Sequence, residues 1–478
     1  MKKNIKTTLI ALFALLPLGM QAQQSVVTKD LYEGTQILNS DFETWADDEG
    51  NTKLEPRYWH SFESASGNLA SWATGKISSS GTSKGGKYSC QLKSSSIFGI
   101  VANGTMTTGQ LNAGNMSAAS TDNHASLDIS STSKDNYGDP FYALLTSCPD
   151  SLVLWVQFSQ GTANSDHPYA TVSAAITNGA YYQEPAVEGT DYSKVLVGYA
   201  ENREIKTTGN KWTRLSIQFS YDKEKYKSDN PQAIMLTLST NADAGQGSKN
   251  DILLIDDLEL IYTHEIEIPA SGYATFTNTV MKNHKVVMPE GLKGYALAVN
   301  ADGEPYITDT LEAGDVLPYN ATLLLEGKAD NYTFSTTLYD DAKNVPATVD
   351  EGLVPASELN SPLDGYNYFY LTGEGTTLAF RKADTGLKIQ DDKALLRVKA
   401  DKAADSYQHI LITPELTGDI NDDGQRSIAD VTALVNRLLG KQEQSSKLFI
   451  PSADVNGDNS TTISDVTELV NILLGKGN

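Results

Sequence analysis

Residues 151–158 read SLVLWVQF, a mostly apolar run with the length of a buried β-strand. Residues 251–262 read DILLIDDLELIY, and the end of 212–219 alternates, with Leu215, Ile217 and Phe219 on one face. In 233–238, alternate residues of the predicted strand, Ile234, Leu236 and Leu238, are expected to point inward. Polar loops rich in Gly, Ser and Asn separate these segments, and no convincing long amphipathic helix interrupts them. Residues 25–262 are therefore predicted to form an all-β domain, a two-sheet sandwich or jelly roll.

Strand signals continue through residues 263–415, where turn sequences such as NADG at 300–303 and GEG at 373–375 separate apolar runs. No segment of useful length there has a helical period. This region is predicted to be an accessory β domain and is interpreted as a spacer.

The pattern changes in residues 416–478. Apolar residues recur at i, i+3, i+4, i+7 and i+8 from Val431, and the same set repeats 35 residues later from Val466. Both segments predict amphipathic helices, which end at Gly440 and Gly475. The expected fold class is thus mainly β, with a β-sandwich first, a middle β domain and a small α-helical domain last.

The composition excludes several classes of protein. The chain has 478 residues, with 37 Lys and Arg against 60 Asp and Glu, and a formal net charge of −23. Nucleic-acid binding depends on Lys and Arg contacts to phosphates, so no nucleic-acid partner is expected. Cys90 and Cys148 are too few for a disulfide scaffold. They could pair in an oxidising compartment or remain two buried thiols.

Residues 1–22 have the pattern of a secretory signal peptide. Lys2, Lys3 and Lys6 precede an apolar run from Leu9 to Met20. That run is shorter than the roughly 20 residues that span a bilayer, and cleavage is expected after Ala22. The protein is therefore predicted to be secreted, extracellular or associated with the cell surface, without membrane insertion after cleavage.

A duplicated loop before each helix is the strongest signal. Residues 419–440 and 454–475 are identical at 13 of 22 aligned positions, and each begins with twelve residues, DINDDGQRSIAD or DVNGDNSTTISD. Calcium takes about six to eight oxygen ligands, which a short loop supplies from alternating positions as it wraps the ion. The predicted ligands of two Ca²⁺ ions, at positions 1, 3, 5, 7, 9 and 12, are Asp419, Asn421, Asp423, Gln425, Ser427 and Asp430, and then Asp454, Asn456, Asp458, Ser460, Thr462 and Asp465.

These two loops and their helices resemble the type I dockerin of glycan-degrading bacteria, with Asp rather than Glu at position 12. The resemblance implies a small calcium-loaded helical domain that docks to a cohesin. It also implies that loop positions 10 and 11 contribute to the choice of partner; these are Ile428, Ala429, Ile463 and Ser464.

Two loop positions differ from the usual pattern. Position 6 must turn sharply, which Gly424 allows and Asn459 tolerates, so the second calcium site is expected to be slightly weaker or more strained. Position 8 is often aliphatic in such loops but is Arg426 and Thr461 here. The isoleucines at position 10 are expected to pack in its place.

Residues 36–262 resemble carbohydrate-binding modules of the jelly-roll type and the carbohydrate-metabolism domain of secreted Bacteroidetes proteins. The resemblance rests on LNSDFETW at 38–45, PRYW at 56–59 and LIDDL at 254–258. It implies one structural Ca²⁺, held by Glu43 with Asp256 or Asp257. The alternative is an edge strand on which both aspartates face water.

Sugar binding requires an exposed aromatic side chain beside amide or acid groups. The candidates outside obvious strand cores are Trp72 and the pair Tyr181 and Tyr182. Any one of them could equally be a packing residue.

No catalytic motif selects a reaction. The 60 acids do not single out a glycosidase pair, and the six histidines are scattered without metal-binding spacing. Three functions remain open. The preferred one is a secreted protein that binds a polysaccharide or oligosaccharide and docks to a cohesin-type partner through calcium. The alternatives are a glycoside hydrolase or polysaccharide lyase on the jelly roll, and a non-catalytic adaptor that binds protein.

Overall fold

The computed structural model describes residues 33–47, 53–72, 77–97, 99–281, 284–299, 303, 305–338, 350–373, 378–384, 386–401, 410–411, 418–420, 426–439, 453, 455–456 and 462–476. The predicted signal peptide lies outside these residues. Within them the fold is mainly β, and both α-helices lie near the C-terminal end, which confirms the fold class predicted from the sequence. None of the described helices has the length and apolar character needed to cross a membrane.

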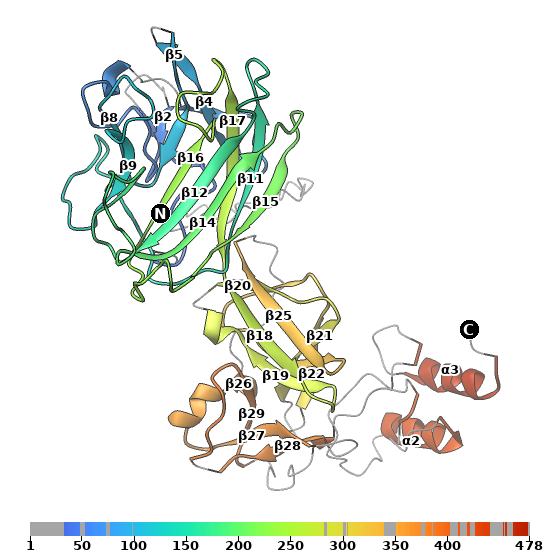
Figure 1. Cartoon of the computed structure of the whole chain (residues 1–478). Coiled ribbons are helices and arrows are strands. Elements are labelled where there is room, and N and C mark those ends of the chain that lie inside the picture. The colour runs from blue at the N-terminus through green and yellow to red at the C-terminus, as the bar shows by residue number, and fades with distance from the viewer. Residues whose placement is uncertain are drawn as a thin grey trace, which may run out of the picture.

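The N-terminal region contains two five-stranded antiparallel sheets (Figure 1). The first sheet has the order β10-β16-β12-β14, with β7 also paired to β16, and the second has the order β15-β11-β17-β4-β3. The strands of the first sheet are β7 (Thr105–Thr107), β10 (Ala143–Leu144), β12 (Ala170–Thr177), β14 (Leu196–Ile205) and β16 (Ala233–Ser239). Those of the second are β3 (Ile77–Ser80), β4 (Ser89–Lys93), β11 (Ser151–Ser159), β15 (Thr213–Gln218) and β17 (Ile252–Ile261).

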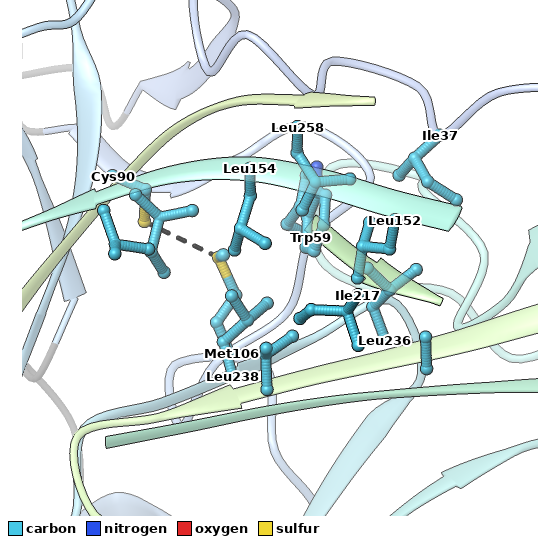
Figure 2. Packing of buried hydrophobic residues seen from close by; sticks show 14 of the residues in the cluster. Ile37, Trp59, Cys90, Met106, Leu152, Leu154, Ile217, Leu236, Leu238 and Leu258 are labelled. Carbon is cyan, nitrogen blue, oxygen red and sulfur yellow. Dashed lines mark hydrogen bonds between the residues drawn. The ribbon is translucent and has the colours of Figure 1, made fainter. Parts of the chain in front are cut away.

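The sandwich core lies between these sheets. Leu152 and Leu154 of β11 and Leu236 and Leu238 of β16 are all 0% exposed, because alternate residues of a strand point to the same face. Each such side chain contributes about 1.5 to 3 kcal/mol relative to its exposed state. Figure 2 shows these leucines in one cluster with Trp59 and Met106.

The two cysteines do not form a disulfide. Cys90 is buried in the sandwich core with its Sγ atom 3.5 Å from Sδ of Met106, as Figure 2 shows, whereas Cys148 is exposed. Burial in apolar surroundings raises the pKa of the Cys90 thiol well above its ordinary value.

A smaller three-stranded sheet covers one end of the outer face of the first sheet. It contains β8 (Gln110–Ala113), β9 (Asn123–Leu127) and β13 (Tyr182–Glu184), in the order β13-β9-β8. Leu127 and Tyr182 of this sheet belong to one buried cluster with Ala175 of β12 and Met235 of β16. Two short hairpins complete the region, namely β1 (Trp45–Asp47) with β2 (Lys53–Pro56) and β5 (Ser95–Ile97) with β6 (Ile100–Ala102); the 3₁₀ turn η1 spans Ala70–Trp72.

The middle region is also β and holds more than one hydrophobic cluster. One cluster stacks Phe276 on Phe334 at 4.2 Å, and a second contains Phe369 and Phe380. One sheet comprises β18 (Thr263–Ile268), β20 (Lys285–Val287), β23 (Val316–Leu317) and β25 (Asp330–Thr337). The nine-stranded sheet comprises β19 (Tyr273–Thr277), β21 (Leu292–Val299), β22 (Pro305–Leu311), β24 (Thr322–Gly327), β26 (Gly352–Pro355), β27 (Tyr366–Thr372), β28 (Ala379–Lys382), β29 (Ala394–Lys399) and β30 (Ile410–Leu411); the 3₁₀ turns are η2 (Asn278–Met281) and η3 (Ala356–Asn360).

The C-terminal helices are α2 (Ile428–Leu438) and α3 (Ile463–Leu473). Leu434 of α2 and Leu469 of α3 are both 0% exposed and share a cluster with Ile420 and Val455 of the two preceding loops. The small domain therefore has its own core, which is built from one face of each helix and from residues of the segments that precede the helices.

Candidate functional site

A pocket of about 560 Å³ lies on the outer face of the first sheet of the sandwich. Val172, Ala174 and Ala200 point into the core, so the alternating residues of β12 and β14 point outward into the pocket. Ser173 of β12 pairs with Glu201 of β14 on one side and with Thr237 of β16 on the other. The strand register thus sets a row of polar side chains across the floor of the pocket.

Trp72 lines the same pocket and is 51% exposed. Its segment is fixed to β8, because the backbone N–H of Leu69 donates to the carbonyl of Ala113 at 2.9 Å. Gly67 permits this approach: its φ is +94°, and a Cβ there would lie 2.4 Å from the carbonyl oxygen of Ala113. The structure therefore brings the predicted sugar platform to the polar row.

Two carboxylates face the pocket in different environments. Glu184 accepts hydrogen bonds from Tyr182 at 2.5 Å and from Ser173 at 3.1 Å, and burial, with a smaller contribution from Glu201, raises its pKa. Glu201 lies 3.6 Å from the guanidinium of Arg203, which itself donates to the carbonyl of Ala242. The pocket therefore pairs a buried acid with a raised pKa and a carboxylate beside a cation.

Neither of the two predicted tyrosines lines the pocket. Tyr182 is 4% exposed and packs edge-on against Tyr192 at 5.0 Å, so its ring is part of the cluster beneath the pocket. Tyr181 is 46% exposed but does not line the pocket, and its hydroxyl donates to Gln183 at 2.7 Å.

The acids expected to hold a calcium ion in the sandwich meet at one loop. Oε1 of Glu43 accepts from the backbone N–H groups of Lys87 and Tyr88 at 2.6 and 2.8 Å. Oδ2 of Asp256, whose residue is 0% exposed, accepts from the N–H of Lys84 at 2.6 Å. Burial, reinforced by Asp257, raises the pKa of Asp256 to about 8.

The sequence did not single out Asp41 as a further acid of this group. Asp41 is 5% exposed, and its Oδ2 atom has no hydrogen-bond partner. Burial, with the charges of Glu43 and Asp257, raises its pKa to about 6. A buried carboxylate oxygen without a hydrogen-bond partner, placed among other carboxylates, suits a hard cation. The residues of this group therefore fit a structural calcium ion, which stays a prediction.

The described parts of the C-terminal loops close onto their helices. Oδ1 of Asp430 accepts from the N–H of Ile420 at 2.7 Å, and Oδ2 accepts from the N–H of Ser427 at 2.7 Å. Asp465 repeats this pattern, accepting from Asn456 at 3.2 Å and from Thr462 at 2.7 Å. Both aspartates are 0% exposed, and buried carboxylates at the ends of an oxygen-rich loop suit a Ca²⁺ ion.

Half of the predicted ligands lie among the described residues. They are Asp419, which is 9% exposed, and the five residues Ser427, Asp430, Asn456, Thr462 and Asp465. The other predicted ligands lie outside the described residues; they are Asn421, Asp423, Gln425, Asp454, Asp458 and Ser460.

The packing expected at position 10 of the loops is wrong. Ile428 and Ile463 are 74% and 69% exposed, because each begins its helix on the solvent side. Ile420 and Val455, both 8% exposed at position 2, fill the core instead. Ala429 and Ser464 are exposed as well, so all the predicted partner-binding residues lie on the surface.

Comparison with known proteins identifies the C-terminal segment. Residues 417–474 match the family model of the Dockerin type I domain, a class that binds calcium and docks to cohesins. The match confirms the dockerin resemblance for this segment and supports calcium-dependent docking. No curated protein matches the chain.

Several solved structures share a weak likeness with the chain. A proposed glycoside hydrolase from Bacteroides thetaiotaomicron is 17% identical over 47% of this chain and 70% of its own, with a TM-score of 0.33. A second one, from Bacteroides vulgatus, is 19% identical over 45% and 89%, with a TM-score of 0.28. The CBM22-1 xylan-binding domain from Paenibacillus barcinonensis is 18% identical over 42% and 90%, with a TM-score of 0.18. TM-scores this low transfer no site, so the pocket is interpreted from its own residues.

Sequence reasoning missed the acids and the arginine of the pocket. The signal that could have found them is the alternation of Tyr199, Glu201 and Arg203 along one strand, which sets two charged side chains on one face. Glu184 carried no such signal, because its role depends on burial beneath residues distant in the sequence.

Proposed function

We propose that the protein is a secreted, glycan-associated modular protein. Its sandwich pocket binds a polysaccharide or oligosaccharide, its middle β region is a spacer, and its dockerin domain docks to a cohesin in a calcium-dependent way. The observation that carries the glycan assignment is the exposed Trp72 beside the polar row of one pocket.

The chemistry of a sugar ring matches this lining. A pyranose presents an apolar C–H face that packs on an aromatic ring and a rim of hydroxyls that require hydrogen-bond partners. Trp72 offers the aromatic surface, and Ser173, Glu201 and Arg203 offer acceptors and donors. Ligand pockets usually measure about 300 to 1,000 Å³, so a volume of about 560 Å³ is suitable for a small number of sugar rings.

The docking surface is supported by the exposed residues at the start of each helix. Ile428 and Ile463 occupy equivalent places in the two repeats, and each presents an aliphatic side chain to solvent. An apolar residue that is not required by the domain's own core is suited to burial against a partner. We propose that calcium, two ions when both loops are filled, fixes these residues for docking by holding each loop against its helix.

A second function is favoured by one specific observation. Glycoside hydrolysis uses one carboxylic acid that stays protonated and one carboxylate that stays ionised. Glu184, with its raised pKa, and Glu201 line the same pocket. We propose them as the acid and the base or nucleophile if the protein cleaves the glycan that it binds.

The full chain, with excess Ca²⁺, should be screened on a glycan array and then incubated with each bound glycan. Binding without release of reducing ends would assign a binding protein, and release of reducing ends would assign the hydrolase. The absence of binding to any glycan would overturn the glycan assignment, whereas capture by a cohesin panel tests the dockerin separately.

A further inference from the structure

The buried site formed by Glu55, His60 and Asp135 has no part in the pocket or in the calcium loops. One carboxylate oxygen of each acid and one ring nitrogen of His60 all lie within 4.8 Å of one another. Among the residues that the structure describes, no other group of three His, Cys, Asp or Glu side chains meets this criterion. Glu55 and His60 are 1% and 0% exposed, and the Asp135 side chain is 3% exposed.

The tautomer of His60 follows from its neighbours. Its Nε2 atom lies 3.0 Å from the carbonyl oxygen of Pro140, which can only accept, so Nε2 carries the proton. The Nδ1 atom then has a lone pair and lies 3.5 Å from the hydroxyl of Ser64 and 3.7 Å from Oδ2 of Asp135, and Asp135 is too far for a hydrogen bond. Burial also lowers the pKa of His60, which favours the neutral ring.

Each carboxylate has one anchored oxygen and one available oxygen. Oε1 of Glu55 accepts from the N–H and hydroxyl of Ser61 at 2.6 and 2.5 Å, whereas Oε2 is buried without a hydrogen-bond partner. Oδ1 of Asp135 accepts from the N–H groups of Tyr137 and Asp139 at 2.9 and 2.8 Å, and Oδ2 faces His60. Outer hydrogen bonds of this kind orient the ligands of metal sites.

Neither acid of this site has an ion-pair partner of opposite charge among the Lys and Arg residues that the structure describes. Arg57 is paired with Asp139 through two hydrogen bonds of 2.6 Å. Two carboxyl groups and an imidazole lone pair therefore face one another in the protein interior, where burial raises the pKa of Glu55 and an ionised carboxylate without a cation is costly.

We propose that Glu55, His60 and Asp135 bind a divalent transition-metal ion, Zn²⁺ in the first instance. An imidazole with two carboxylates suits zinc better than calcium, which prefers a shell of oxygens alone. Two ligands of one zinc ion at about 2.0 to 2.1 Å stand roughly 3.3 Å apart, so the 3.7 Å between His60 and Asp135 closes with a small side-chain shift. The ion would join the end of β2, the turn that follows it and the loop at 134–140.

The test uses the full chain, stripped with a chelator, refilled with excess Ca²⁺ and then given Zn²⁺. The wild-type chain should retain one more zinc ion after desalting than the double variant Glu55→Gln, Asp135→Asn, and only the wild type should gain several degrees in Tm. The double variant keeps the shapes of both side chains, and the amide that replaces the Glu55 carboxylate could donate to Nδ1 of His60. Asp243→Asn is the matched control: it alters the exposed His167–Asp243 pair, separated by 2.8 Å, and should retain as much zinc as the wild type.

Equal zinc retention by the wild type and the double variant would overturn the proposal, as would retention of calcium in place of zinc at this site. Should the double variant not fold, Co²⁺ added to the wild type provides an independent measurement. A visible absorption band of a nitrogen- and oxygen-ligated, low-coordinate cobalt ion supports the site, and a spectrum of hydrated cobalt alone contradicts it.

Discussion

The hydroxyl of Tyr182 donates a hydrogen bond of 2.5 Å to Oε1 of Glu184, and so connects the hydrophobic cluster beneath the pocket to an acid on the pocket wall. The bond fixes the orientation of a carboxyl group whose pKa is raised by burial and by Glu201. A fixed carboxyl group with a raised pKa beside a second carboxylate is the arrangement in which a proton can be delivered to a glycosidic oxygen.

Glu184→Gln should lower kcat/KM for any glycan that the protein cleaves by about 100- to 10,000-fold, with little change in affinity, because the amide keeps the shape and loses the acidic proton. Since the proton is present below the raised pKa of Glu184 and lost above it, the wild-type rate should fall on the alkaline side. Measurement of kcat/KM against pH checks both statements. A Gln variant with full activity and an unchanged profile would exclude Glu184 as the acid.

Trp72→Ala should weaken glycan binding about 5- to 50-fold, equivalent to roughly 1 to 2 kcal/mol of lost aromatic contact. Tyr181→Ala is the matched control, because Tyr181 is 46% exposed but lies outside the pocket. Isothermal titration with the tightest glycan of the array gives both affinities. Equal losses in the two variants, or no loss in the Trp72 variant, would show that the ligand binds elsewhere.

Removal of calcium should unfold the C-terminal domain while the sandwich persists. The core shared by Leu434 and Leu469 is small, so the closed loops and their ions contribute much of the stability. Asp419→Ala should weaken one loop, and the double change with Asp454→Ala should lower the helical circular dichroism of the full chain as EDTA does. A helical signal unaffected by EDTA would contradict calcium-dependent folding of this domain.

The exposed isoleucines should matter for docking and not for stability. Ile428→Asp with Ile463→Asp replaces side chains that are 74% and 69% exposed, so the Tm in calcium should change by no more than about a degree or two. Binding to a cohesin that captures the wild type should fall at least tenfold. Leu434→Ala, in the domain core, is the contrasting variant and should lower the Tm itself. Undiminished capture of the double variant would place the docking surface on other residues.

The periodic features of this fold could be predicted from the sequence, whereas contacts between distant segments could not. Alternation in 233–238 correctly placed Ile234, Leu236 and Leu238 in the core, since a strand face follows directly from local pattern. The local sequence did not indicate that Ile428 would be exposed and Ile420 buried in the core of the C-terminal domain. Which of the two isoleucines is buried depends on how the loop folds back on the helix. Likewise His60 and Asp135 lie far apart in the sequence, and only the sandwich brings them together.

Glu259 on β17 provides a test of stability against pH. The residue is 6% exposed, Oε1 has no hydrogen-bond partner, and burial raises its pKa to about 8 from an ordinary value of 4.5. Between these two values the folded chain holds a proton that the unfolded chain has lost, so the free energy of unfolding falls as pH rises through this window.

Glu259→Gln should therefore raise the free energy of unfolding above pH 8 by about 1 to 3 kcal/mol, because it removes the cost of a buried carboxylate. At a pH near the ordinary value of 4.5 the two proteins should be close to equal. Urea unfolding of the sandwich at a series of pH values gives the comparison. Glu265→Gln is the control, because it removes an exposed carboxylate from β18, the next strand in the sequence. It should leave the pH dependence of the free energy of unfolding unchanged. If the free energy of unfolding of the Glu259 variant fell with pH as steeply as that of the wild type, a group other than Glu259 would have to cause the pH dependence.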